Sequence, residues 1–372
     1  MIQFLELRVS NKEQNLTFLH THAAKQIVVS TKIQELIDKV HADRNLNDFS
    51  RPHLGASLLG HKCDRWLWLS FHWAVKPEFP GRIMRLFRRG HQEEPNIISD
   101  LKSIGIDIKE SVNQTRVEFG SHVSGSLDAI INSGMPGDEK SKYISEFKTH
   151  SKKSFDDLVK NGVQKSKLSH YVQCQVYMAG TGIHKAMYIG VCKDTDEMYT
   201  EFLEYDHDFA QKYIERGKRI ALTDRMPESL SADPSWYECK FCDGHDFCFK
   251  SKTTKEVNCR TCARSTALSN STWFCAKWDA VIPNEEQAKG CSSHVLHPDL
   301  VSWKQLDGPD ADTGAYEIEG KKTLNGNFKF SDEEENIPVY SSKELLANPT
   351  ACALADDYML DIRKNFDAKI VG

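Results

Sequence analysis

The sequence predicts an α/β fold in which a mixed central β-sheet is flanked by helices, followed by a cysteine-rich metal-binding region and a C-terminal appendage. Three observations favour it. The chain has 372 residues, of which 40% are hydrophobic; strand-like and helix-like patterns alternate between residues 91 and 222; and seven of the eleven cysteines fall between Cys239 and Cys291. A chain of this length forms two or three domains without needing disulfides. Clustered thiols then indicate metal binding in a reducing compartment.

Changes in composition divide the chain into four predicted regions. Residues 1–50 carry no chemical signature and are predicted to be an N-terminal appendage, residues 51–250 contain the α/β core, and residues 251–300 form a zinc-binding knuckle. Residues 301–372 combine an acidic segment with a helical region. Within 305–335, nine acidic residues face three basic ones, which predicts a mobile or edge segment, and Ser342 to Phe366 has the periodicity of one or two helices.

Charge and hydropathy exclude several classes of protein. The formal net charge is −5, so contacts with nucleic acid must use local basic patches. The sequence has no run of 18 apolar residues, and the first six residues lack the basic start and apolar stretch of a signal peptide. We therefore expect a cytoplasmic protein, in the host cell cytoplasm if the chain is encoded by a phage, with no membrane partner.

The elements of the core follow from local periodicity. A basic helix carrying Arg82, Arg85, Arg88 and Arg89 is predicted to end near Gly90, and a second helix follows it and carries Glu94. The later elements are strands over 116–119 and 122–131 joined at Gly120–Ser121, a strand over 143–148, a helix over 171–179, a strand over 187–191 and a helix over 209–222. Asp128 lies within the second of these strands.

The chemistry of the core is concentrated in two acids and a lysine. Asp128 lies on one strand, and Glu146 and Lys148 share one face of the adjoining strand because side chains alternate with a period of two. Two carboxylates suit a hard divalent cation such as Mg²⁺, and an ammonium can orient a water molecule and offset charge on a phosphoryl oxygen. The pattern alone is weak, because surface strands produce this spacing by chance.

Two further patterns give these residues a context. Gly90-x-x-x-Glu94 places a carboxylate on the upstream helix, and Gln173-x-x-x-Tyr177 places an amide and a phenol one helical turn apart downstream. In this order the chain resembles the PD-(D/E)XK nuclease superfamily, in its RecB-like and phage lambda-exonuclease-like branches, over about residues 54–250. The resemblance implies a restriction-endonuclease-like core that requires Mg²⁺ or Mn²⁺.

The resemblance also implies roles for individual residues. Glu94, Asp128 and Glu146 correspond to the metal ligands, Lys148 to the lysine that orients water, and Gln173 with Tyr177 to the motif of RecB-like members. His91 is a rival to Glu94, since some RecB-like members carry histidine there. His150 and His170 lie near the motifs, but lone histidines are more often packed or solvated than catalytic, and they are assigned no role.

The cysteines separate into two sets. Cys63 far upstream and Cys239-x2-Cys242-x5-Cys248 resemble the pattern of iron–sulfur nucleases, including CRISPR-associated exonucleases, in which one early and three late cysteines hold a [4Fe-4S] cluster. That resemblance implies a structural staple that closes the nuclease core. Cys174, Cys192 and Cys352 lie among apolar neighbours and are interpreted as small core residues.

The second set, Cys259-x2-Cys262-x12-Cys275-x15-Cys291, has the spacing of a structural zinc site, with His294 as a substitute ligand. A zinc ribbon made of Cys239, Cys242, Cys259 and Cys262 is an alternative grouping, which leaves Cys248, Cys275 and Cys291 without partners.

Basic residues near the motifs point to a polyanionic substrate. Residues 140–168 contain eight lysines or arginines against three acids. Trp66, Trp68, Phe71 and Trp73 can stack on unpaired bases, although core packing is the favoured interpretation. We expect a phage-type DNA exonuclease that processes ends for recombination or replication, with DNA and a recombination or annealing protein as partners, and a homo-oligomer is compatible with these patterns. An endonuclease and an inactive nucleic-acid-binding or assembly protein are the alternatives.

Overall fold

The computed structural model describes residues 32–44, 51–110, 116–327, 337–366 and 368–371. These residues form two compact units, one within 1–48 and 78–93 and the other within 49–77 and 94–372. Most of the predicted appendage over 1–50 lies outside the described residues. Within the described ranges, no helix is long and apolar enough to cross a lipid bilayer.

The smaller unit is helical. It contains a helix over residues 32–44 and the first part of α3 (Gly81–Ser103), which are joined by an ion pair between Arg85 and Asp38. The predicted helix end near Gly90 is wrong, because α3 continues through Gly90 and Pro95. An interior glycine costs a helix only about 1 kcal/mol. Burial of Ile97, Ile98 and Leu101 further along α3 exceeds that cost.

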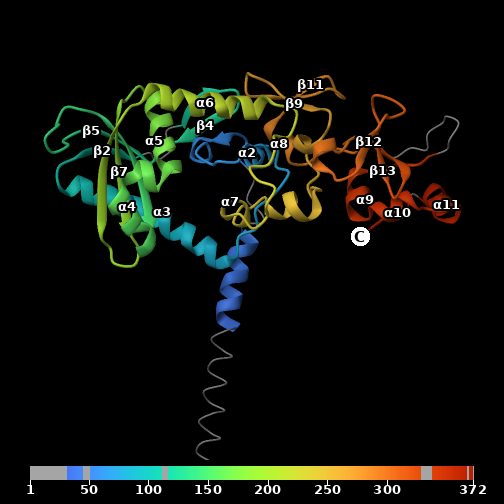
Figure 1. Cartoon of the computed structure of the whole chain (residues 1–372), viewed down its shortest axis with the longest axis horizontal. Helices are drawn as coiled ribbons and strands as arrows, with labels where there is room; N and C mark the ends of the chain where they lie inside the picture. Colours follow the sequence, from blue (N-terminus) through green and yellow to red (C-terminus); the bar gives the residue numbers. More distant parts are fainter. Residues whose placement is uncertain (1–31, 45–50, 111–115, 328–336, 367, 372) are drawn as a thin grey trace, which may run out of the picture. The chain divides into compact units, whose positions relative to one another are not determined.

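The larger unit contains a five-stranded mixed sheet, which is drawn at the left of Figure 1. Its order is β2 (Asp107–Glu110), β5 (Ala129–Ser133), β6 (Tyr143–His150), β7 (Lys185–Cys192) and β8 (Met198–Glu204). β6 and β7 are parallel, and the other neighbouring strands are antiparallel. Parallel neighbours need a crossover, which here consists of α4 (Lys152–Ser166) and α5 (Leu168–Thr181).

Helices cover both faces of this sheet. Ile144 of β6 belongs to the core cluster that contains Leu158 of α4 and Val172 of α5, whereas Phe147 of the same strand belongs to the cluster that contains Ile97 of α3. Residues three apart on a strand point to opposite faces. The predicted α/β fold with a mixed central sheet between helices is therefore confirmed.

A second, three-stranded sheet has the order β1 (Leu54–Gly55), β4 (Val123–Ser126) and β3 (Arg116–Gly120). It packs near α6 (His207–Leu222), which in turn contacts α2 (Asp64–Phe71). Trp66, Trp68, Phe71 and Trp73 are all buried, which confirms core packing over base stacking for these rings.

The predicted single strand over 122–131 is wrong, because the chain leaves β4 at Ser126 and enters β5 of the other sheet at Ala129. Asp128 lies at this crossing. Its Oδ2 accepts a hydrogen bond from the backbone N–H of Phe147 at 3.0 Å. A side-chain oxygen thus accepts the bond that a backbone carbonyl of a neighbouring strand normally accepts in a sheet. The exchange of sheets therefore puts the Asp128 carboxylate against β6.

The cysteine-rich region contains little regular structure. Its helical elements are α7 (Tyr237–Lys240), a π-helical turn over Phe247–Ser251, a 3-10 turn over Cys259–Thr261 and α8 (Asn284–Gln287). Its strands are β9 (Ser265–Ala267), β10 (Trp273–Cys275) and β11 (Ala280–Ile282), which form an antiparallel sheet. Two further 3-10 turns lie outside the region, at Ala56–Leu58 and Pro298–Leu300. Arg260 fastens this region to the core. Its guanidinium donates to the carbonyl of Phe71 at 2.9 Å and lies 3.8 Å from the ring centre of Trp73.

The C-terminal region forms a four-stranded sheet in the order β12 (Lys304–Leu306), β13 (Gly314–Ile318), β14 (Lys321–Asn325) and β15 (Val339–Tyr340). For residues 305–335 the sequence predicts a mobile or edge segment, and β12 is indeed an edge strand. β13 and β14 are instead internal strands of the sheet, and their Tyr316 and Leu324 side chains are buried. Residues 328–336 lie outside the described residues. Three helices follow instead of one or two, α9 (Ser342–Ala347), α10 (Pro349–Ala353) and α11 (Asp357–Phe366), since Asn348 and Pro349 interrupt the first.

Candidate active site

The side chains of Asp128, Glu146 and Lys148 lie together where β5 meets β6. The ammonium of Lys148 bonds to Glu146 Oε1 and lies 3.9 Å from Asp128 Oδ2. Glu146 and Lys148 share one face of β6, and Asp128 is held against that strand by its bond to the Phe147 N–H. The pairing of β6 therefore orients Glu146 and Lys148, and a side-chain bond to the same strand orients Asp128.

Glu146 is the most unusual of these groups, because only 1% of its surface is exposed and its Oε2 has no hydrogen-bond partner among the described residues. Burial raises the pKa of Glu146 to about 8, the charges of Asp128 and Glu94 act in the same direction, and Lys148 opposes them. Although burial disfavours its charge, the carboxylates of Glu146 and Asp128 raise the pKa of Lys148. An unpartnered buried carboxylate oxygen is expensive unless a cation reaches it.

Glu94 lies on α3 close enough for its charge to act on Glu146, and its side chain is half-buried. His91, the alternative in this motif, occurs one turn earlier on α3 and is exposed. The electrostatic contact with Glu146 favours Glu94 over His91.

Gln173 and Tyr177 lie on α5, and Tyr177 is close enough to Glu146 and Asp128 for their charges to act on its hydroxyl. Gln173 Nε2 lies 3.5 Å from the Tyr177 hydroxyl, which donates to the carbonyl of Ser126 at 2.7 Å. This bond fixes the end of β4 immediately before Asp128. Gly125 is needed here, because a Cβ at that position lies only 2.7 Å from the Tyr177 ring and hydroxyl.

The first cysteine set lines one small pocket. Cys63, Cys239, Cys242 and Cys248 all border it, together with Trp66, although Cys63 is far from the others in the sequence. Burial raises the pKa of Cys242 to about 11, and the neighbouring thiols of Cys63 and Cys248 act in the same direction. Arg65, on α2, acts on Cys248 in the opposite direction.

The second cysteine set lines a separate pocket of about 280 Å³, bordered by Cys259, Cys262, Cys275, Cys291 and His294. His294 is engaged elsewhere, since its Nδ1 bonds to Ser342 Oγ at 2.8 Å and its Nε2 to the carbonyl of Asn258 at 3.0 Å. Both ring nitrogens are used by these bonds, so the four thiols, without His294, are the donors this pocket offers.

The two Cys-x-x-Cys pairs border different pockets, which favours two quartets over a single zinc ribbon. All eleven cysteines are free thiols. Across the described part of the chain, no group of three or more His, Cys, Asp or Glu side chains is arranged as a metal site.

Exposed lysines precede β6 and lie on α4, namely Lys140, Lys142, Lys152, Lys153, Lys160 and Lys165. The predicted arginine face of α3 belongs to the smaller unit, where Arg82, Arg88 and Arg89 are exposed and Arg85 pairs with Asp38.

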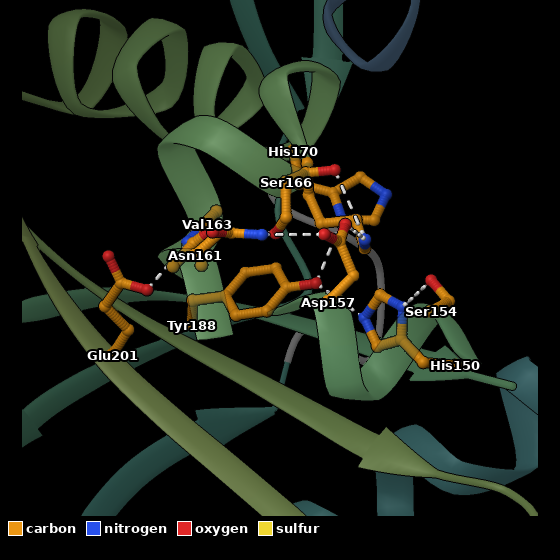
Figure 2. A network of polar contacts seen from close by, with 11 residues as sticks. His150, Ser154, Asp157, Asn161, Val163, Ser166, His170, Tyr188 and Glu201 are labelled. Carbon is orange, nitrogen blue, oxygen red and sulfur yellow. Dashed lines mark hydrogen bonds and ion pairs between the residues drawn. The ribbon is translucent and has the colours of Figure 1, made fainter. Parts of the chain in front are cut away.

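A polar network beside Lys148 was not predicted from the sequence. His150, two residues further along the same face of β6, and His170 on α5 both bond to the hydroxyl of Tyr188 on β7 (Figure 2). The period of two along β6 and the position of His170 one turn before Gln173 were available signals. For Tyr188 the sequence gives no such signal, because its neighbours are those of an ordinary core residue in a buried strand.

Comparison with known proteins gives weak likenesses only. No family model matches the chain, and no curated protein matches it. Among solved structures, the crystal structure of SSO0001 aligns with a TM-score of 0.38 at 15% identity, over 59% of this chain and 96% of the other. An alkaline exonuclease (LHK-Exo) from Laribacter hongkongensis aligns with a TM-score of 0.34 at 14% identity, over 46% and 87%, and its complex with dAMP with 0.33 at 13%, over 45% and 86%. TM-scores of this size do not establish a common fold, so a function for this chain has to be inferred from its own residues.

Proposed function

We propose that this chain is a Mg²⁺- or Mn²⁺-dependent deoxyribonuclease, with exonuclease action at DNA ends favoured. The observation that carries the proposal is the meeting of Asp128, Glu146 and Lys148 at the junction of β5 and β6. The donor set fits a hard divalent cation, because it consists of carboxylate oxygens and includes the buried, unpartnered Oε2 of Glu146.

The residues take distinct roles in phosphodiester hydrolysis. Asp128, Glu146 and Glu94 would hold the cation, which when bound supplies Lewis acidity toward the scissile phosphate and a lowered pKa of water. The Lys148 ammonium, held by Glu146, orients the attacking water and offsets charge that develops on the phosphoryl oxygens. Water adds to phosphorus as the 3′-oxygen leaves, so the released product carries a 5′-phosphate. Tyr177 and Gln173 position the chain that leads into Asp128.

End processing for recombination or replication, in a phage setting and alongside an annealing protein, is the role we propose for this activity. An endonuclease uses the same groups, and an inactive DNA-binding or assembly protein is the third candidate. A site that has lost its activity does not have to keep a lysine bonded to a buried glutamate, so the presence of Lys148 favours an active enzyme.

We also propose that the cysteine quartets hold inorganic groups. Four thiols around one pocket fit a [4Fe-4S] cluster at Cys63, Cys239, Cys242 and Cys248, which joins α2 to the end of the core. Four thiols around the second pocket fit structural zinc at Cys259, Cys262, Cys275 and Cys291. Each group would cross-link the segments that supply its thiols.

Incubation with end-labelled linear DNA and with covalently closed circular DNA tests the activity. An exonuclease releases nucleotides from linear DNA in Mg²⁺ and leaves the circle intact, and an endonuclease also converts the circle. A protein that binds both without cleaving either, in Mg²⁺ and in Mn²⁺, contradicts the proposed activity.

Anaerobic purification tests the cluster separately. A [4Fe-4S] protein is brown, with broad absorbance near about 400 nm and about four irons per chain. A colourless sample containing zinc alone removes the cluster from the proposal and leaves the nuclease site untouched.

A further inference from the structure

We propose that His170 contacts a phosphate of the bound DNA strand through its Nε2–H, and that His150, Tyr188 and Ser154 position it. The inference rests on the proposed nuclease function and adds a substrate-binding residue beside Lys148. It follows from a chain of hydrogen bonds that begins on α4, passes through the sheet and ends on α5 (Figure 2).

The hydroxyl of Tyr188 is the centre of this chain. It lies 2.8 Å from His150 Nε2 and 2.9 Å from His170 Nδ1, and the other nitrogen of His150 lies 3.1 Å from Ser154 Oγ. Tyr188 is fully buried and His150 nearly so. A tyrosine hydroxyl has one proton, so it donates to one imidazole and accepts from the other.

The bonds are satisfied when every ring is neutral and all protons point the same way. Two opposite proton directions satisfy all three bonds, and only one of them leaves His170 with a donor for an anion. In that direction Ser154 donates to His150 Nδ1, His150 Nε2–H donates to Tyr188, and Tyr188 donates to His170 Nδ1. The remaining proton of His170 is on Nε2. Burial lowers the pKa of His150 to about 4 and that of His170 to about 3, with Lys148 and Lys167 acting in the same direction, and this agrees with neutral rings.

Nε2 of His170 is the end of the chain at which a ligand can bind. Among the described residues it has no hydrogen-bond partner, and the residue is only half-buried. A histidine whose one nitrogen is held by a buried partner and whose other nitrogen is open is the arrangement in which the ring contacts a substrate or ligand.

The surroundings of His170 favour an anionic ligand. Lys148 and Lys167 are close enough for their charges to act on the ring. The turn before His170 is held rigidly, because Glu201 Oε2 accepts from the Val163 N–H at 2.8 Å and Lys167 pairs with Asp157 at 3.1 Å. Gly162 makes this turn with a φ of 72°. A fixed N–H donor among lysines beside the proposed metal site suits a phosphate oxygen.

Binding of fluorescein-labelled linear DNA, with Ca²⁺ in place of Mg²⁺ to prevent cleavage, tests the inference. His170→Ala should raise the Kd about tenfold, because one hydrogen bond to a charged acceptor is lost. His170→Gln, whose amide N–H reaches a similar position, should stay within about threefold. His184→Ala is the matched control, since that exposed ring stacks on Tyr205 outside the network and should leave the Kd unchanged.

The positioning role has its own readout. In ¹⁵N-labelled protein, His170 should show a protonated Nε2 and an unprotonated Nδ1, and Tyr188→Phe should convert this to a mixture of tautomers while the circular dichroism spectrum is retained. An unchanged Kd in His170→Ala, or a His170 protonated on Nδ1, overturns the inference even if Glu146→Ala abolishes cleavage. Wild-type protein that cleaves no DNA in Mg²⁺ or Mn²⁺ overturns the proposed function, and the inference with it.

Discussion

The carboxylate–lysine site and the cysteine pockets are built in opposite ways. Asp128, Glu146 and Lys148 bond to one another and to the backbone of β6, so the sheet arranges them before any ligand arrives. The cysteines border pockets in segments that are mostly short strands and turns, and only Cys63 comes from a distant part of the chain. The sheet holds the side chains of the first region in place, whereas the second region, on our proposal, is stabilised by the inorganic groups that it binds.

The largest effect is expected from substitutions in the carboxylate–lysine site, which should abolish its activity and leave the cysteine pockets unchanged. Lys148→Ala and Glu146→Ala should each reduce DNA cleavage by at least about 10³-fold, because charge stabilisation and cation binding are lost. Iron and zinc contents should not change. Lys185→Ala is the matched control, since Lys185 also pairs with an acid, Asp138, on the same sheet but at a partly exposed position. Ordinary rates in Glu146→Ala contradict the site.

Replacing a cysteine breaks the second region. Cys239→Ser should lower the unfolding temperature by about 10 °C and remove iron from the protein, because the chain loses a link between residue 63 and the segment over 239–248. Thermal unfolding and iron analysis measure this. Cys352→Ala, a buried thiol in neither quartet, should change the temperature by about 2–3 °C and keep the iron. Equal shifts of the unfolding temperature in Cys239→Ser and Cys352→Ala would exclude an inorganic group bound jointly by the first set of cysteines.

The attachment of the knuckle to the core can be weakened without touching a cysteine. Arg260→Met should reduce the free energy of unfolding by about 3 kcal/mol, because the buried guanidinium bonds to Phe71, Pro52 and Gln287. Denaturant unfolding with metal analysis measures the change. Arg225→Ala, which removes the exposed arginine of a pair with Asp299, should cost less than about 1 kcal/mol. If Arg260→Met is as mild as Arg225→Ala, the knuckle is not held by this contact.

The smallest effect concerns pH. Because the pKa of Glu146 is raised to about 8, the folded state binds a proton more tightly than the unfolded state, so its contribution to stability is present below about pH 4.5 and is lost as pH rises toward 8. In metal-free buffer, wild type should lose about 3 °C of unfolding temperature relative to Glu146→Gln between pH 5 and pH 8. Parallel curves would mean that Glu146 is not strained by burial.

The sequence was sufficient for the α/β fold class and the strand that carries Glu146 and Lys148, because alternation over 143–148 is a local signal. The approach of Asp128 to Glu146 and Lys148 was predicted as well. The exchange between two sheets at Asp128 was not, since it depends on a side-chain bond to Phe147, 19 residues away. Continuity of α3 through Gly90 and the internal strands within 305–335 also depend on tertiary burial. The network on Tyr188 was missed because a buried hydroxyl joins two histidines that look solitary in the sequence.

The central claim is that Asp128 and Glu146 bring a divalent cation to the scissile phosphate, and a thiophilic metal-rescue measurement tests it most directly. Linear DNA with a phosphorothioate at the terminal linkage should be cleaved slowly in Mg²⁺ and restored toward the normal rate by Mn²⁺, with no restoration in Glu146→Ala. Equal cleavage of both substrates in EDTA, or identical rescue in Glu146→Ala, contradicts the account.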